Sequence, residues 1–164
     1  MVWVVREAHE FVVFDETEPG DARATLGSGQ VGREAWRFEL KVYIAGSFVD
    51  QKSLRPIAES IWQLNHEIVG TWLQEVKKPS TMSPNDFKKK LAIKDVAEVC
   101  TADLIILDNR QSSGGKNCEW GIGLASFQHK QLWLVGEPSN VFHYLADCVF
   151  SNWDEVIEEL KKND

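Results

Sequence analysis

Residues 95–125 read DVAEVCTADLIILDNRQSSGGKNCEWGIGLA, and this stretch decides the fold. Its first part has a helical pattern, and residues 104–107 (LIIL) form a continuous apolar run that is typical of a strand buried on both faces. A glycine-containing loop over 108–116 follows, and a helix is expected over 117–128. Helix, buried strand, loop and helix in this order predict a parallel sheet with helices on both faces.

The same alternation extends in both directions along the chain. We expect strands at 41–45, 67–73 and 131–135, and helices with apolar residues at helical spacing over 54–64, 91–100 and 153–160. Asn152 is a suitable N-cap for the last helix. The polar, proline-containing segment 75–86 is expected to be a loop that can act as a lid. The predicted fold is therefore α/β, flavodoxin- or Rossmann-like and doubly wound, with a mainly parallel sheet.

Residues 1–39 differ from the rest of the chain. Two short strand-like runs, 2–5 and 11–14, precede a polar stretch with Pro19-Gly20 and Gly27-Ser28-Gly29. This pattern predicts turns or a mobile loop. We therefore divide the chain into an N-terminal β appendage, 1–39, and an α/β domain, 40–164.

Charge and composition exclude several classes of function. The 164 residues include 18 Lys and Arg against 25 Asp and Glu, which gives a net charge of −7. An acidic surface disfavours binding to a nucleic acid polymer or an anionic membrane. No apolar run approaches the ~20 residues that span a bilayer, and the first residues do not resemble a signal peptide. The three cysteines lack a CxxC spacing, so we expect free thiols and a cytoplasmic location.

Parallel sheets of this kind bind ligands at the carboxyl ends of their strands. That edge is expected to carry Gly46-Ser47, the loop 108–116 and the segment 136–140. The loop Ser112-Ser113-Gly114-Gly115 and the helix after it can form an anion site from backbone N–H groups. Glu119 is expected in the first turn of that helix, where the dipole lowers its pKa. The less specific interpretation, a tight turn and a carboxylate that only stabilises the helix, stays open.

Other motifs predict little. Residues 27–32 match GxGxxG but have no preceding strand and no long helix after them, so a dinucleotide site is not expected. The four histidines lack metal-ligand spacing, so no metal site is expected. Gly121 and Gly123 lie inside a predicted helix, which suggests that this helix packs closely against its strand.

Three segments together resemble the nucleoside 2-deoxyribosyltransferase-like superfamily, including its nucleoside 5′-monophosphate N-glycosidase branch. Tyr43-Ile44-Ala45-Gly46-Ser47 resembles the family's Y-x-x-G-S motif after the first strand. Asp95, followed by Ala102-Asp103 and an apolar strand, resembles a second motif. The segment 114–121 (GGKNCEWG) resembles the G-x-x-x-E-φ-G nucleophile segment, in which φ is apolar. The resemblance covers about residues 41–162.

The resemblance implies a role for each matching residue. Glu119 would be the nucleophile that attacks C1′ of the sugar, Tyr43 would orient its carboxylate, and Asp95 would contact the sugar or help protonate the leaving base. A covalent glycosyl-enzyme would then pass the sugar to water or to a second base. No metal or organic cofactor is implied. The residues expected to bind substrate are Gly46, Ser47, Phe48, Ser113, Gly114 and Gly115.

The resemblance also has gaps. Ser113 lies where transferases of free nucleosides commonly have Asp, which favours a nucleotide, but Val49 replaces an Arg of the phosphate clamp. Arg55 or Lys116 could substitute for that Arg. The family implies a homodimer or larger homo-oligomer, and the candidates for a contribution from a neighbouring subunit are Ser139, Asn140 and His143. A non-catalytic nucleotide-binding or sensing module with the same fold is the alternative function.

Overall fold

The computed structural model describes residues 5–7, 10–12, 40–74, 78–111, 114–126 and 130–162. The chain divides into two compact units, Met1–Ala35 and Trp36–Asp164. In the first, β1 (Val5–Glu7) and β2 (Glu10–Val12) pair antiparallel and form a two-stranded sheet of their own. β1 overlaps the predicted run 2–5 only at Val5, and β2 overlaps the predicted run 11–14 at Phe11 and Val12; the rest of both runs lies outside the described residues. The predicted boundary between residues 39 and 40 stays a prediction.

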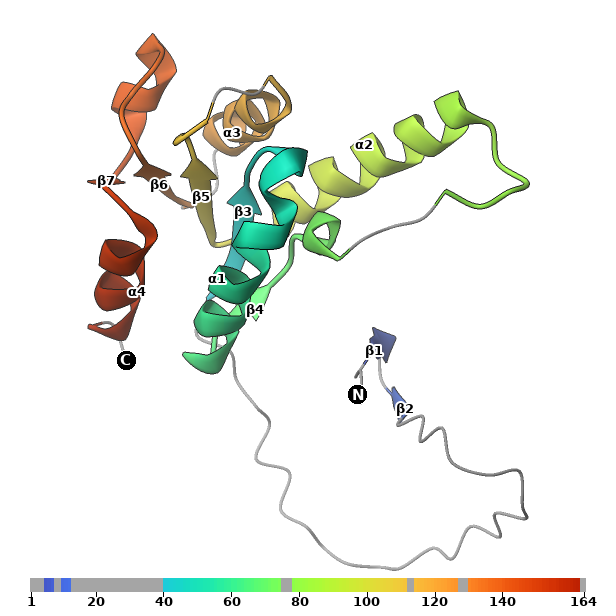
Figure 1. Ribbon diagram of the computed structural model, residues 1–164, viewed down its shortest axis with the longest axis horizontal. Coiled ribbons are helices and arrows are strands. Elements are labelled where there is room, and N and C mark those ends of the chain that lie inside the picture. Colours follow the sequence, from blue (N-terminus) through green and yellow to red (C-terminus); the bar gives the residue numbers. More distant parts are fainter. Residues whose placement is uncertain are drawn as a thin grey trace, which may run out of the picture. The chain divides into compact units, whose positions relative to one another are not determined.

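The second unit is built on a five-stranded parallel sheet (Figure 1). Its strands are ordered β4-β3-β5-β6-β7, and all neighbouring pairs run parallel. The strands are β3 (Lys41–Ala45), β4 (Glu67–Ile68), β5 (Leu104–Asp108), β6 (Gln131–Val135) and β7 (Cys148–Phe150). The α/β, doubly wound fold with a parallel sheet is confirmed.

Helices cover both faces of this sheet (Figure 1). On one face α1 (Gln51–Gln63) and α4 (Trp153–Lys161) pack over Val42, Ile44 and Ile106. On the other, α2 (Pro84–Thr101) and α3 (Gly115–Ala125) pack over Tyr43, Ala45 and Ile105. All five residues of β5 are buried, because this central strand is covered on both sides.

The strand order fixes where a ligand can bind. The chain continues from β3 to the outer strand β4 on one side, then returns to β5 on the other side of β3. The connections therefore diverge at the carboxyl ends of β3 and β5, which is the usual ligand position in open parallel sheets. The predicted shared edge is confirmed, since Asn109 Nδ2, after β5, donates 3.1 Å to Ser139 Oγ, after β6.

Several predicted boundaries were wrong. The strand expected over 67–73 ends at Ile68, and the chain turns into a short 3-10 helix, η2 (Thr71–Leu73). Helix α2 begins at Pro84, well before residue 91, because Ser83 caps it: Ser83 Oγ accepts from the backbone N–H of Asp86 at 3.1 Å. The edge strand β7 and the 3-10 helix η3 (Val141–Leu145) were not predicted. The Asn152 N-cap is confirmed.

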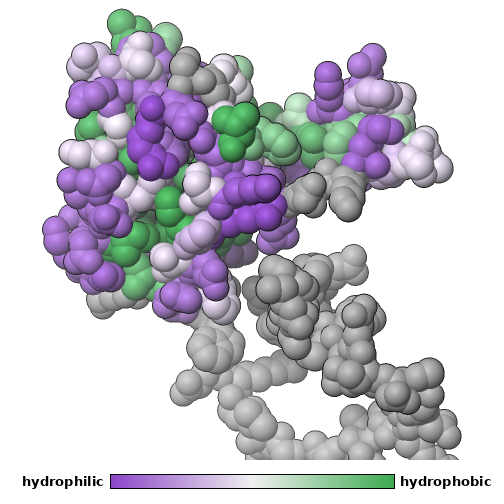
Figure 2. Space-filling model, in the orientation of Figure 1, coloured by the Kyte–Doolittle hydropathy of each residue, from purple (hydrophilic) through white to green (hydrophobic). Residues whose placement is uncertain are grey.

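The outer part of α2 extends away from the sheet and carries both hydrophobic and hydrophilic residues on its surface (Figure 2). Ile93 is 62% exposed there. Among the helices that the structure describes, none combines the length and apolar character needed to cross a membrane. The three cysteines are unpaired, as predicted.

Candidate functional site

Tyr43 lies at the centre of the candidate site. It points from β3 toward the α2–α3 face of the sheet and is completely buried. Its hydroxyl has no hydrogen-bond partner of good geometry among the described residues. Burial, reinforced by the charges of Glu119 and Asp95, raises the pKa of Tyr43. A buried hydroxyl without a partner is costly, so its persistence marks a place where a ligand or a catalytic group is expected.

Glu119 approaches this hydroxyl from α3. Its Oε2 atom is buried and also lacks a hydrogen-bond partner of good geometry in the described part of the chain. The Tyr43 hydroxyl nevertheless acts on the Glu119 carboxyl as a donor that lowers its pKa. The Tyr43 hydroxyl can therefore donate to the Glu119 carboxyl, and the roles that the resemblance implies for these two residues stay predictions.

The predicted ionisation of Glu119 was wrong. Because α3 already begins at Gly115, Glu119 lies in the second helical turn, and the first turn contains no acidic residue. The effect of the helix dipole decreases beyond the first turn. Burial dominates, and together with the charges of Asp95 and Glu98 it raises the pKa of Glu119 to about 7. The carboxyl is thus partly protonated near neutral pH rather than held fully ionised.

Helix α2 brings two more carboxylates to this place. Burial raises the pKa of Asp95, the charge of Glu98 raises it further, and Lys94 opposes both. Glu98 Oε2 accepts from the backbone N–H of Thr71 at 3.1 Å, and Glu98 Oε1 accepts from Thr71 Oγ1 at 2.5 Å. Glu98 was not predicted. The only sequence signal was its position three residues after Asp95, one helical turn further on the same face.

The loop after β3 is shaped by close packing. A Cβ added to Gly46 would lie 2.6 Å from Leu54 Cδ1 and 3.3 Å from the Trp72 ring, so only glycine fits without movement. Trp72 Nε1 donates to the Ile44 carbonyl at 2.8 Å. Ser47 is partly buried, and Phe48 is 71% exposed beside it. Gly46, Ser47 and Phe48 therefore lie at the predicted edge of the sheet.

The loop before α3 is only partly described. Ser113 lies outside the described residues. Gly114 and Gly115 are exposed, and a Cβ added to either would meet nothing within 4 Å. Packing therefore does not require glycine at these two positions. Gly114 is the N-cap of α3 and has no side chain to satisfy the first N–H groups. These N–H groups are the predicted anion site.

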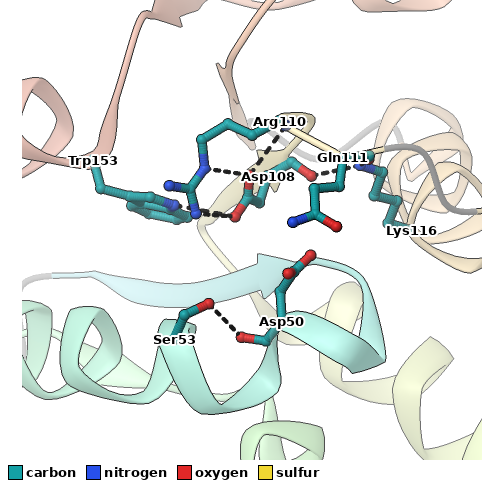
Figure 3. A network of polar contacts seen from close by, with 7 residues as sticks. All are labelled: Asp50, Ser53, Asp108, Arg110, Gln111, Lys116 and Trp153. Atoms are coloured by element: carbon teal, nitrogen blue, oxygen red, sulfur yellow. Dashed lines mark hydrogen bonds and ion pairs between the residues drawn. The ribbon is translucent and has the colours of Figure 1, made fainter.

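Lys116 anchors the first turn of α3 to the end of β5 (Figure 3). Its ammonium group donates to the Asp108 carbonyl at 2.7 Å and also to the Gln111 carbonyl. The side chain is 1% exposed, and burial lowers the pKa of Lys116. By donating to both carbonyls, Lys116 ties residues 108 and 111 to the start of the helix that carries Glu119.

Asp108 fixes the same loop from the opposite face of the sheet (Figure 3). Arg110 donates to both carboxylate oxygens, at 2.9 and 2.7 Å, and Trp153 Nε1 donates at 3.2 Å. Burial alone would raise the pKa of Asp108, but the hydrogen bonds from Arg110 and Trp153 outweigh it and lower that pKa. Asp50 and Ser53 line a polar pocket of about 280 Å³ beside this ion pair.

Both residues that could replace the missing Arg of the phosphate clamp are engaged within the fold. Lys116 is buried against two carbonyls. Arg55 Nε donates to the Leu73 carbonyl at 2.7 Å, and its Nη2 lies 3.3 Å from Gln51 Oε1. Neither side chain is positioned as a free cation at the loop after β3.

The candidates for a contribution from a neighbouring subunit lie within a network of this chain. His143 is completely buried. Its Nδ1 accepts from the Ser139 N–H at 3.1 Å, and its Nε2 lies 2.9 Å from Asn117 Oδ1. Asn140 Oδ1 accepts from the Phe142 N–H at 2.8 Å. His143 thus links the segment after β6 to the first turn of α3 and cannot extend into another subunit.

The two glycines inside α3 serve different purposes. A Cβ on Gly123 would lie 2.4 Å from Ile105 Cδ1, so close packing against the strand is confirmed there. Gly121 is exposed, and a Cβ on it would meet nothing within 4 Å, so the prediction was wrong for this residue. Gly121, Trp120 and Leu124 instead line an open, mostly apolar groove of about 420 Å³ with Phe142 and Leu145.

Among the residues that the structure describes, no group of three or more His, Cys, Asp or Glu side chains is arranged to hold a metal ion. Glu98 is instead bonded to Thr71, and the charges of Asp95 and Glu98 act unfavourably on the ionised form of Glu119. The arrangement places a hydroxyl donor beside the Glu119 carboxyl and two further carboxyl groups near it.

Comparison with known proteins places the fold. No protein-family model matches the sequence. No curated protein matches it either. Among solved structures, a conserved protein from Enterococcus faecalis V583 is 17% identical with a TM-score of 0.59, covering 76% of this chain and 98% of its own. A 2-deoxyribosyltransferase from Bacillus psychrosaccharolyticus is 18% identical with a TM-score of 0.56, covering 71% and 90%.

A CMP N-glycosidase from Clostridium botulinum also matches, at 16% identity and a TM-score of 0.48, over 74% of this chain and 98% of its own. At these identities, the similarity concerns the path of the backbone. The resemblance to the nucleoside 2-deoxyribosyltransferase-like superfamily therefore holds at the level of the fold, which the α/β unit of this chain shares with the 2-deoxyribosyltransferase.

Proposed function

We propose that this protein is an enzyme that cleaves or transfers the sugar at the N-glycosidic bond of nucleosides or their 5′-monophosphates. One observation carries the proposal: Tyr43 and Glu119 bring a buried hydroxyl and a buried carboxylate oxygen together, and neither has a hydrogen-bond partner of good geometry in the described chain. The pair lies on strand and helix positions that match the family's motifs. The fold shared with a 2-deoxyribosyltransferase supports the same conclusion.

The proposed reaction is a double displacement at C1′. An ionised Glu119 oxygen attacks C1′ from the face opposite the base, and the C1′–N bond breaks with its electron pair passing to the base nitrogen. Asp95 or water supplies the proton that this nitrogen takes up. Water or the nitrogen of a second base then attacks C1′ and gives up a proton to Asp95 or to solvent, and the C1′–O ester bond breaks to restore the carboxylate. Tyr43 donates to Glu119 and keeps it oriented.

The surroundings of the carboxylates favour this division of roles. Burial raises the pKa of Asp95, so a protonated form that can donate to the base is more populated than for an exposed aspartate. Glu119, with a pKa of about 7, must lose its proton before it can attack. The rate should therefore rise with pH through about 7.

We also propose which segments bind the substrate. Gly46, Ser47 and Phe48 would contact the sugar and base from the loop after β3, and Ser113, Gly114 and Gly115 would hold the 5′ end. The exposed position of Phe48 is consistent with stacking on a base. Because Arg55 and Lys116 are engaged elsewhere, backbone N–H groups at the start of α3 would have to carry most of the binding of a 5′-phosphate.

A homodimer or larger homo-oligomer in the cytoplasm is part of the proposal. The exposed apolar residues Phe142 and Leu145, beside the groove on α3, are consistent with a contact between copies. Free cysteines are consistent with a reducing compartment. We place the chemistry in residues 40–164 and assign it no contribution from the appendage 1–39. Light scattering on the full chain would measure its oligomeric state.

A product assay tests the function. The full chain is incubated with each common nucleoside and 5′-monophosphate, ribo and deoxyribo, with and without a second base, and products are separated by chromatography. Free base indicates hydrolysis and an exchanged base indicates transfer, and both must be absent in Glu119→Gln. If no substrate is consumed but a nucleotide raises the melting temperature, the protein is the non-catalytic binding module.

A further inference from the structure

Glu98 is a third carboxylate of the site that no motif identified. Both of its oxygens are used: one accepts from the Thr71 backbone N–H at 3.1 Å, the other from the Thr71 hydroxyl at 2.5 Å. The side chain is only 12% exposed, and Lys94 Nζ lies 3.8 Å from Oε1. Bonds from one residue to both oxygens hold the carboxylate in one orientation.

The turn that Glu98 holds forms one side of the site. A Cβ on Gly70 would lie 3.3 Å from the Tyr43 ring, so this backbone lies directly against the ring of the proposed donor. On the other side of the turn, Gln51 donates to the Trp72 carbonyl at 2.5 Å and Arg55 to the Leu73 carbonyl at 2.7 Å. Helices α1 and α2 therefore fix η2 from opposite ends, and Glu98 provides the connection to α2.

We propose that Glu98 is a positioning residue for the reaction at Glu119: tied to Thr71, it fixes the turn beside Tyr43 and holds a negative charge close to the Glu119 and Asp95 carboxyls. This inference rests on the proposed function for its kinetic consequence. The groups that face Glu119 are Tyr43 from β3 and Asp95 and Glu98 from α2, with Lys94 as the cation paired to Glu98.

The consequence is a pH dependence that Glu98 sets in part. Burial is the main cause of the raised pKa of Glu119, and the charge of Glu98 adds to it. The charge of Glu98 also raises the pKa of Asp95, after burial. A neutral residue at 98 therefore leaves more of Glu119 ionised at mildly acidic pH and fewer protons available on Asp95.

Glu98→Gln keeps the size of the side chain and removes its charge. The charge of Glu98 is the smallest of the causes that act on the pKa of Glu119, so we expect the acidic limb of kcat/KM to move to lower pH by only about 0.3 of a pH unit. Starting from a pKa near 7, this shift raises the ionised fraction of Glu119 at pH 6 about twofold. Thr71→Val keeps the charge but removes one of the two hydrogen bonds, so the limb should move in the same direction by less. Glu59→Gln, at an exposed position on α1, is the matched control and should leave the profile unchanged.

A second measurement does not depend on activity. Glu119→Gln is introduced into the normal chain and into the Glu98→Gln variant, and the resulting increase in melting temperature is measured at pH 4 and at pH 8. The gain is the increase at pH 8 minus the increase at pH 4. We expect this gain to fall by about a tenth when Glu98 is neutral, because the pKa of Glu119 would then lie about 0.3 lower. If the chain has no activity but the gain falls, the influence of Glu98 on the Glu119 carboxyl stands and the proposed function fails.

Two results would overturn the inference. One is a Glu119→Gln gain that is the same in both backgrounds, because it means that Glu98 has no influence on Glu119. The other is an acidic limb in an active, folded Glu98→Gln enzyme that coincides with those of the normal chain and of Glu59→Gln. A fall in kcat at all pH values with an unmoved limb counts as the second result, since it indicates a structural role alone.

Discussion

Replacing Glu119 with Gln should stabilise the protein, and the gain should depend on pH. Burial raises the pKa of this carboxyl from 4.5 to about 7 in the folded chain. Between these values the folded state holds a proton that the unfolded state has lost, so stability falls as pH rises from about 4.5 through 7. A shift of ~2.5 units at ~1.4 kcal/mol per unit corresponds to about 3 kcal/mol at pH 8. Gln removes this cost.

The assay is thermal or urea unfolding of the full chain at pH 4, 6 and 8. At pH 4 both states are mostly protonated, so Glu119→Gln and the normal chain should have nearly equal stability. At pH 8 the variant should be more stable by ~3 kcal/mol, or roughly 10 °C in melting temperature. Glu59→Gln makes the same substitution at an exposed position. Its stability should differ from that of the normal chain by the same small amount at every pH. A Glu119→Gln gain that does not increase from pH 4 to pH 8 would refute the reasoning.

Three further changes test other parts of the molecule. Tyr43→Phe removes a donor to a charged group and should lower kcat/KM about 10- to 100-fold while moving the acidic limb to higher pH; an unchanged limb would mean that the hydroxyl does not act on Glu119. Lys116→Met leaves two carbonyls without their buried donor and should cost about 2–4 kcal/mol in urea unfolding, whereas a loss below 1 kcal/mol would contradict the anchoring role. Gly121→Ala fills open space on α3 and should stabilise by ~0.5–1 kcal/mol, whereas Gly123→Ala should give no such gain because Ile105 must move; equal gains at both positions would contradict the difference in packing.

The sheet could be predicted because its signals are local. The runs 104–107 and 131–135 are short and bounded by polar segments, which favours covered strands over buried helices. Asn152 likewise marks a helix start by side-chain chemistry alone. That Tyr43, Asp95 and Glu119 form one catalytic site was implied only by the family resemblance, and it stays a prediction.

What could not be predicted depends on tertiary contacts. The chain leaves the sheet after Ile68 because Thr71 is bound by Glu98 and Trp72 donates to Ile44, and none of these contacts has a signal within the segment 67–73. β7 has only three residues, and its pairing with β6 decides that it is a strand.

The ionisation of Glu119 failed for a related reason. A two-residue difference in the start of α3 moved the carboxyl out of the first turn, and the burial that then dominates its pKa comes from residues distant in sequence. Glu98 was missed because an acidic residue on a polar helix is ordinarily exposed to solvent, and its two hydrogen bonds come from Thr71, which is distant in sequence.

The covalent step at Glu119 can be measured directly. The full chain is incubated with a nucleoside whose 2′-deoxy-2′-fluoro arabinosyl sugar slows breakdown of a glycosyl ester, and the intact protein and its peptides are weighed by mass spectrometry. We predict one added sugar on the peptide that contains Glu119, one equivalent of released base, and neither in Glu119→Gln. Released base with no adduct at Glu119, or an adduct that persists in Glu119→Gln, would contradict the account.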